Sequence, residues 1–130
     1  LNDKSIQVSP AETLATSLLA TGFPYYDFSY QDRYLDLLKE LMQKSHGLRR
    51  MGAASIDLAY TACGSFEGFF EANLKPCDVA AGKIIIEEAG GRVTNFSGGD
   101  DVIFSGEIIG AGPIFDEFLS TLQRKWFLDY

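Results

Sequence analysis

Two carboxylates in the second half of the sequence have types and spacing that could do chemistry. Asp78 lies in Lys75–Gly82, at the predicted start of a helix, where backbone amides favour an anion. It is either a helix cap or a ligand for a hard cation such as magnesium, which prefers oxygen donors. Glu71 ends the apolar stretch Gly68–Glu71 and is either a solvated strand end or an acceptor for substrate hydroxyls. Their separation of seven positions allows both to face one cleft at the carboxyl ends of strands.

A third candidate is the segment Arg50–Ala54, which runs from a predicted strand through Gly52 into a helix. Backbone amides at a helix start can meet an anion or a ligand oxygen, and the small Ala53 and Ala54 leave room for close approach. We interpret Asp57 as a structural residue that caps the helix or forms a hydrogen bond within its packed interior.

The elements that would position these residues alternate between strands and helices. Leu14–Thr21 is apolar and fits either a helix or a strand. This alternation predicts one α/β domain over residues 1–130, with a mixed, mostly parallel sheet flanked by helices. Strands are predicted over Leu1–Pro10, Gly47–Gly52, Phe66–Glu71, Arg92–Asn95 and Glu107–Ala111. Helices are predicted over Gln31–Ser45, Ala53–Cys63, Asp78–Ala89 and Pro113–Arg124.

Composition narrows the classes of function. The 130 residues are 46% hydrophobic and include ten Phe, enough apolar surface for a folded core. A net charge of −7 disfavours nucleic acid as a partner, and no apolar stretch is long enough to indicate a membrane partner. One histidine (His46) and two separated cysteines (Cys63 and Cys77) argue against a His-rich or Cys-rich metal centre. Buried free cysteines would be consistent with a cytoplasmic location.

The segments that contain the candidate residues, taken in order along the chain, resemble segments of the inositol monophosphatase family. Arg49–Ala59 is similar to its "RRxGSAALDLA" segment, and Gly68–Glu71 to its "DGFWE" strand. Lys75–Gly91, which reads KPCDVAAGKIIIEEAGG, is similar to its carboxy-terminal signature "KPWDxAAGxxIxxEAGG". Leu1–Ser9 and Leu19–Pro24 also resemble segments of the family, so the resemblance covers nearly the whole chain.

The resemblance implies a hydrolase that cleaves phosphate monoesters of inositol and related polyols with Mg²⁺ or Mn²⁺. Asp78 matches the aspartate that binds a metal ion, and Glu71 matches the glutamate that hydrogen-bonds the inositol hydroxyls. Ala53 and Ala54 match positions whose neighbourhood contacts the substrate ring. Cys77 stands where the family usually has Trp, which removes a large apolar group from the cleft wall and leaves substrate preference open.

The family's other metal ligands belong to its amino-terminal half, on a Glu-Glu pair and a DxIDGT motif, and that half is not represented here. A single carboxylate cannot hold ions that each need about six oxygen ligands. We therefore predict that residues 1–130 are the carboxy-terminal domain of such an enzyme. We predict that this chain contains no catalytic residue and is inactive in isolation. Its expected partners are the amino-terminal half of the same enzyme and a second copy of the enzyme in a homodimer.

Three alternatives remain open from the sequence. The chain could belong to a fructose-1,6-bisphosphatase or a nucleotide 3′-phosphatase, which share the fold and the use of metal ions. It could also be a non-catalytic module that binds small molecules or forms dimers. A DxIDGT motif in upstream coding sequence would favour the enzyme, and a panel of phosphate esters would separate the substrates.

Overall fold

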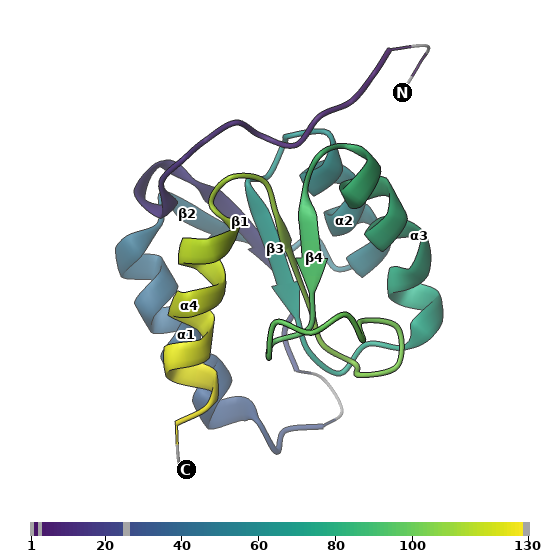
Figure 1. Cartoon of the computed structure of the whole chain (residues 1–130). Helices are drawn as coiled ribbons and strands as arrows, with labels where there is room; N and C mark the ends of the chain where they lie inside the picture. Colours follow the sequence, from purple (N-terminus) through teal and green to yellow (C-terminus); the bar gives the residue numbers. More distant parts are fainter. Residues whose placement is uncertain (1, 3, 25–26, 129–130) are drawn as a thin grey trace.

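A five-stranded sheet lies between two pairs of helices in the computed structural model, which describes residues 2, 4–24 and 27–128 (Figure 1). The chain begins its regular structure with a short 3₁₀ turn at Leu14–Thr16. The strands are β1 (Leu18–Thr21), β2 (Gly47–Arg49), β3 (Gly68–Glu71), β4 (Arg92–Thr94) and β5 (Ile108–Ala111). The helices are α1 (Gln31–Lys44), α2 (Ala54–Ala62), α3 (Pro76–Glu88) and α4 (Phe115–Trp126).

The sheet is mixed, as predicted, with strand order β2-β1-β3-β5-β4. β1 pairs in parallel with both β2 and β3, whereas β5 is antiparallel to β3 and to β4. Four strands therefore run in one direction and β5 runs in the other. The carboxyl ends of β2, β1 and β3 consequently meet at one edge of the sheet.

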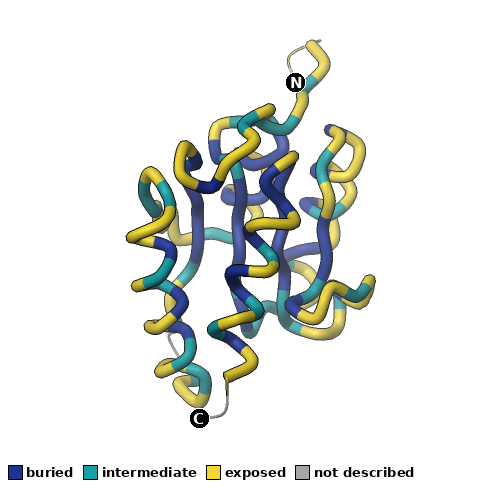
Figure 2. The backbone as a smooth tube through the Cα atoms, turned by 60° about the vertical axis from the view of Figure 1, so that its left-hand side comes forward, coloured by how far each residue is buried: buried dark blue, intermediate teal, exposed yellow. Residues whose placement is uncertain are grey.

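The two sheet faces have separate hydrophobic cores. Phe70 packs with residues of α1 and α4 on one face, and Phe69 packs with Leu58 and Ile86 of α2 and α3 on the other. Neighbouring side chains of a strand point to opposite faces, so β3 contributes to both cores. Figure 2 shows these strands as the buried centre of the molecule, with exposed residues on the outer sides of the helices.

Close packing of α2 against α3 depends on a glycine. A Cβ atom at Gly82 would lie 2.5 Å from Cδ1 of Leu58, so only hydrogen fits between the helices at this point. Ala62 of α2 is also fully buried in this core and is a second small residue there. This packing holds the amino-terminal ends of both helices near the carboxyl end of β3, where Figure 1 shows them.

The predicted strand over Leu1–Pro10 is wrong for the described residues of that range, which form no strand. The Val8 N–H donates a backbone hydrogen bond to the Ala89 carbonyl (3.1 Å), but this bond does not form part of a strand ladder. Alternating Ile6 and Val8 face a groove beside α3 instead of a strand partner.

Element boundaries differ by a few residues at other points. The ambiguous stretch Leu14–Thr21 divides into the 3₁₀ turn and β1. The third helix begins at Pro76, two residues before Asp78, because proline suits the first helical position. The last helix begins at Phe115 rather than Pro113. Among the described helices, none has both the length and the apolar character needed to cross a membrane.

Candidate active site

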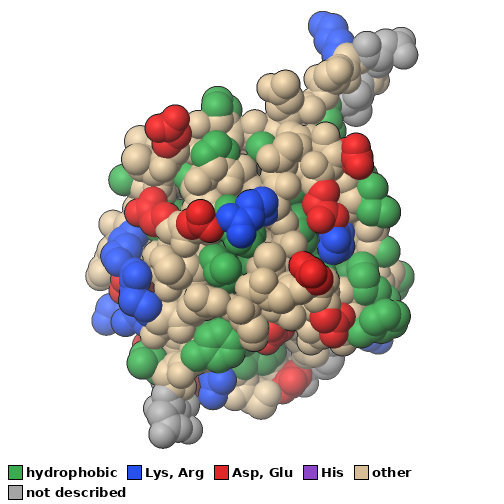
Figure 3. Space-filling model, viewed as in Figure 1, with side chains coloured by type: hydrophobic (Ala, Val, Ile, Leu, Met, Phe, Trp, Pro, Cys, Tyr) green, Lys and Arg blue, Asp and Glu red, His purple; other side chains and the backbone are tan. Residues whose placement is uncertain are grey.

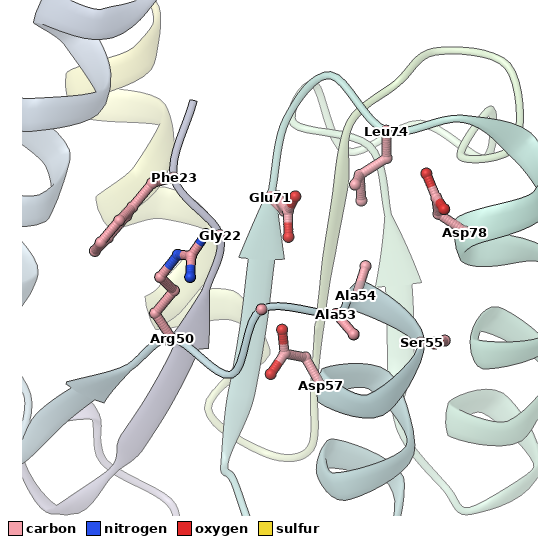
Figure 4. A pocket seen from close by; sticks show the side chains of 11 residues that line it. Gly22, Phe23, Arg50, Ala53, Ala54, Ser55, Asp57, Glu71, Leu74 and Asp78 are labelled. Carbon is pink, nitrogen blue, oxygen red and sulfur yellow. The ribbon is translucent and has the colours of Figure 1, made fainter. Parts of the chain in front are cut away.

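A pocket of about 320 Å³ opens where β1, β2 and β3 end. Its walls come from the residues after β1 and β2, from the first turns of α2 and α3, and from the end of β3 (Figure 4). The structure brings together all four residues singled out from the sequence, which are Ala53, Ala54, Glu71 and Asp78. The remaining lining residues are Gly22, Phe23, Arg50, Gly52, Ser55, Asp57 and Leu74.

The Glu71 carboxylate lies directly against the backbone that follows β1. A Cβ atom at Gly22 would collide with this carboxylate, so glycine leaves the space that Glu71 occupies. Burial, with a smaller contribution from the negative charges of Asp57 and Asp78, raises the pKa of Glu71 to about 7, and the positive charge of Arg50 acts against this rise. Glu71 is therefore poised to accept hydrogen bonds in a poorly solvated position.

The Asp78 carboxylate has a structural bond and a free oxygen. Its Oδ2 accepts a hydrogen bond from the Lys75 backbone N–H (2.9 Å), while the Asp78 N–H donates to the Lys75 carbonyl (2.9 Å). Its Oδ1 has one weak contact within the described part of the chain, with the Cys77 thiol at 4.0 Å. Asp78 thus caps α3 through one oxygen and presents the other to the pocket. Its two interpretations from the sequence, as a helix cap and as a metal ligand, are therefore compatible.

Asp57 does not behave as the sequence interpretation expects. The residue is 1% exposed, and within the described part of the chain its Oδ1 has no hydrogen-bond partner. Asp57 is the fourth residue of α2, beyond the reach of the free amides at the helix start, and its own N–H already donates to the Ala53 carbonyl. Burial raises the pKa of Asp57 to about 6, with Arg50 acting against this rise. The expected hydrogen bond within the helix is therefore wrong.

The start of α2 presents backbone to the pocket rather than large side chains. Gly52 has a φ of +94°, in the region that glycine adopts without strain, and Ala53 is extended before the first helical residue. The first amides of a helix have no partner within the helix. Ala53 and Ala54 therefore border an approach to polar backbone groups, with only methyl groups in the way (Figure 4).

Arg50 and Phe23 complete the pocket; the sequence analysis placed Arg50 in a candidate segment without giving its side chain a role, and it did not identify Phe23 as a site residue. The Arg50 guanidinium carbon lies 5.2 Å from the centre of the Phe23 ring, a cation–π arrangement. Arg50 is the one cation among the lining residues that the structure describes. Two adjacent arginines, Arg49 and Arg50, indicated that a cation could lie near the site. The sequence could not show that Arg50 is the one that lines the pocket, because this depends on the direction of β2 in the sheet.

The donor set suits a hard cation only in part. Carboxylate oxygen is a ligand that Mg²⁺ prefers, and Asp78 has one oxygen to offer. Within the described residues, however, no group of three His, Cys, Asp or Glu side chains could hold a metal ion. Asp78 can therefore supply one ligand to an ion, while the rest of the coordination shell must come from elsewhere.

The sequence profile of the inositol monophosphatase family matches residues 1–126. The chain belongs to the inositol monophosphatase family. The fold agrees, since an inositol monophosphatase from Anabaena superposes with a TM-score of 0.87 at 38% identity, over 95% of this chain and 51% of that one. The extragenic suppressor protein suhB of Bartonella henselae gives 0.90 at 37% identity, over 95% of this chain and 47% of that one.

Family members with other names are also similar. A SuhB protein of Neisseria meningitidis serogroup B is 52% identical over 113 residues, 87% of this chain and 43% of that protein. Nus factor SuhB of Pseudomonas aeruginosa is 40% identical over 126 residues, 95% of this chain and 46% of that protein. The chain thus spans about half the length of these inositol monophosphatase family members.

Proposed function

We propose that this chain forms one side of the active site of a Mg²⁺-dependent phosphomonoesterase that hydrolyses inositol monophosphate or a related polyol phosphate. The observation that carries the proposal is the convergence of Asp78, Glu71 and the start of α2 on one pocket at the carboxyl ends of three strands. Membership of the family and likeness to an inositol monophosphatase structure support it.

Each residue has a role that follows from its surroundings. Asp78 offers its free carboxylate oxygen to Mg²⁺, and Glu71 accepts hydrogen bonds from polyol hydroxyls in its half-buried position. Ala53 and Ala54 let the substrate ring approach the backbone. When bound, Mg²⁺ supplies charge neutralisation at the phosphate and activation of water.

The net charge of the pocket explains why phosphate binding would require groups other than the lining residues. Three carboxylates and one arginine line it, so a phosphate group would meet net negative charge. Cations resolve this conflict, but the described residues do not complete a site for one. We therefore place the chain as a carboxy-terminal domain that shares its active site with further residues of a longer protein.

The test compares two proteins under the same conditions. The full natural protein that contains this sequence is expected to release phosphate from inositol 1-phosphate only with Mg²⁺ or Mn²⁺, and the 130-residue chain alone is expected to release none. Absence of hydrolysis by the full protein, across inositol, fructose bisphosphate and nucleotide 3′-phosphate esters, would overturn the phosphatase proposal. Full activity of the isolated chain would overturn the shared site.

A second candidate function comes from the names of relatives. Proteins 40–52% identical to this chain are named SuhB, and several are named Nus factors. This favours a role exerted by binding other macromolecules, which differs from the non-catalytic module considered from the sequence, a module that binds small molecules or forms dimers. An Asp78→Asn variant of the full protein separates the two roles, because a binding role in the native cell would survive the loss of a metal ligand.

A further inference from the structure

The Asp57 carboxylate is the feature of the pocket that the proposed roles leave unexplained. It is 1% exposed, and no hydrogen-bond donor within the described residues reaches its Oδ1. A buried carboxylate oxygen without a donor destabilises a fold. Such a group in a well-packed helix calls for a partner, and the described residues do not supply one.

The position of Asp57 shows where that partner would come from. Asp57 borders the same pocket as Glu71, and Figure 4 shows the two carboxylates approaching one space, from the first turn of α2 and from the end of β3. Arg50 is the lining cation, yet no ion pair joins it to either carboxylate in the described part of the structure. Its guanidinium lies over Phe23 instead.

The chemistry of this space selects the kind of partner. A phosphate group brings negative charge and acceptor oxygens, which two neighbouring carboxylates would repel. A hydroxyl group brings a donor without charge. Two carboxylates side by side can receive two hydroxyls side by side, and Gly22 and Ala53 keep the adjoining walls small enough for a ring to approach.

We propose that Asp57 is a specificity-determining residue, which accepts a hydrogen bond from a polyol hydroxyl next to the one that Glu71 accepts. The pocket thereby selects ligands with two adjacent hydroxyl groups and places them at the end away from Asp78. This inference rests on the proposed function for the identity of the substrate, whereas the recognition of a diol rests on the pocket alone.

The kinetic test compares two esters that differ in hydroxyl groups. In the full natural protein, Asp57→Asn keeps the size of the side chain but removes its charge. We expect kcat/KM to fall roughly tenfold or more for inositol 1-phosphate, because the amide oxygen is an uncharged and weaker acceptor for the hydroxyl and the NH2 group cannot accept. For phenyl phosphate, which has no ring hydroxyls, kcat/KM should stay within about twofold. Asp32→Asn, at an exposed position in the first turn of α1, is the matched control and should change neither value.

A binding test distinguishes this inference from the phosphatase proposal. Titration of the same proteins with myo-inositol, followed by amide NMR signals at the start of α2, should show roughly tenfold weaker affinity in Asp57→Asn. If neither ester is hydrolysed, the phosphatase proposal fails and this titration still decides the role of Asp57. Equal loss for both esters, or unchanged affinity for myo-inositol, would overturn the inference. Thermal unfolding supplies the structural check, because a merely structural role would lower stability as well.

Discussion

At the scale of residues, the three carboxylates that line the pocket differ in their surroundings. Asp78 and Glu71 are both half-buried, but Asp78 already accepts a backbone hydrogen bond through one oxygen, whereas Asp57 is buried with an unpaired oxygen. Burial and repulsion by the neighbouring Asp57 and Asp78 carboxylates raise the pKa of Glu71. Burial alone raises the pKa of Asp57. The same chemical group thus caps a helix at Asp78, has a raised pKa at Glu71 and keeps an unpaired oxygen at Asp57, according to its surroundings.

Sequence reasoning found two of these carboxylates and misjudged the third. Asp78 and Glu71 stand in motifs whose spacing predicts a shared cleft, and the structure places both in one pocket. Asp57 was interpreted as internally bonded because the sequence shows the helix but not which face of it is buried. Gly22 and Phe23 follow β1, and their closeness to Glu71 depends on strand pairing that no local pattern specifies.

The raised pKa of Glu71 predicts how stability depends on pH. A carboxyl whose pKa is higher in the folded state binds its proton more tightly there, so the free energy of unfolding falls as pH rises from about 4.5 to about 7. Glu71→Gln should remove up to about 3 kcal/mol of this fall, since one pKa unit corresponds to about 1.4 kcal/mol. Urea denaturation at pH 5 and pH 8 measures the difference.

The control for this comparison is Glu12→Gln, at an exposed position near the beginning of the chain. Its denaturation curves should change with pH as those of the wild-type protein do. An equally steep loss of stability in Glu71→Gln and wild type would contradict the assigned environment of Glu71.

At the scale of elements, the pocket is a product of strand direction. β2, β1 and β3 run in parallel, so the residues that follow them meet at one edge, and α2 and α3 begin at the same edge. The periodicity of Gln31–Ser45 predicted α1 to within one residue, because its apolar stripe faces one core. The strand predicted at Leu1–Pro10 failed because alternation indicates a half-buried extended chain without ensuring that a partner strand is available.

Close approach between β1 and β3 gives a prediction at this scale. Gly22→Ala would push a methyl group into the Glu71 carboxylate, and either the side chain or the end of β1 must move. We expect a loss of about 1–3 kcal/mol in the free energy of unfolding, together with weaker binding of the polyol phosphate. Gly47→Ala is the matched control in β2, because its new methyl group would lie 3.4 Å from Leu18 Cδ1, an ordinary contact. Equal behaviour of the two variants would count against the close packing described here.

At the scale of the whole molecule, the outer face of α3 carries an exposed apolar patch beside its charged residues. Ile84 is 61% exposed and Ile85 38% exposed, and both line a shallow groove with Ile6. Figure 3 shows hydrophobic side chains on the side of the molecule that α3 occupies in Figure 1. The chain spans about half the length of its relatives, so a longer protein offers further residues to cover such a face.

This face predicts the behaviour of the 130-residue chain on its own. We expect it to self-associate, and light scattering over a range of concentrations should report a mass above that of a monomer. Ile84→Glu should lower that mass, because a charge would then lie within the contact. Phe104→Glu, in the loop before β5, is the control and should leave the mass unchanged. A monomer at every concentration would show that the exposed isoleucines do not drive association.

The family and fold class were accessible from sequence because the motifs span nearly the whole chain in order, and the profile match confirms them. The homodimer and the cytoplasmic location stay predictions. The substrate could not be predicted as firmly, because Cys77 stands beside Asp78 where the family usually has Trp, and because no metal-binding group of three side chains occurs among the described residues.

The most direct measurement is Mg²⁺-dependent hydrolysis of inositol 1-phosphate by the full natural protein carrying Asp78→Asn. Asparagine can still accept the Lys75 N–H, so the free energy of unfolding should stay within about 1 kcal/mol of wild type. Loss of the charged metal ligand should lower kcat/KM roughly 100-fold or more. Hydrolysis at the wild-type rate with an unchanged requirement for Mg²⁺ would contradict the account.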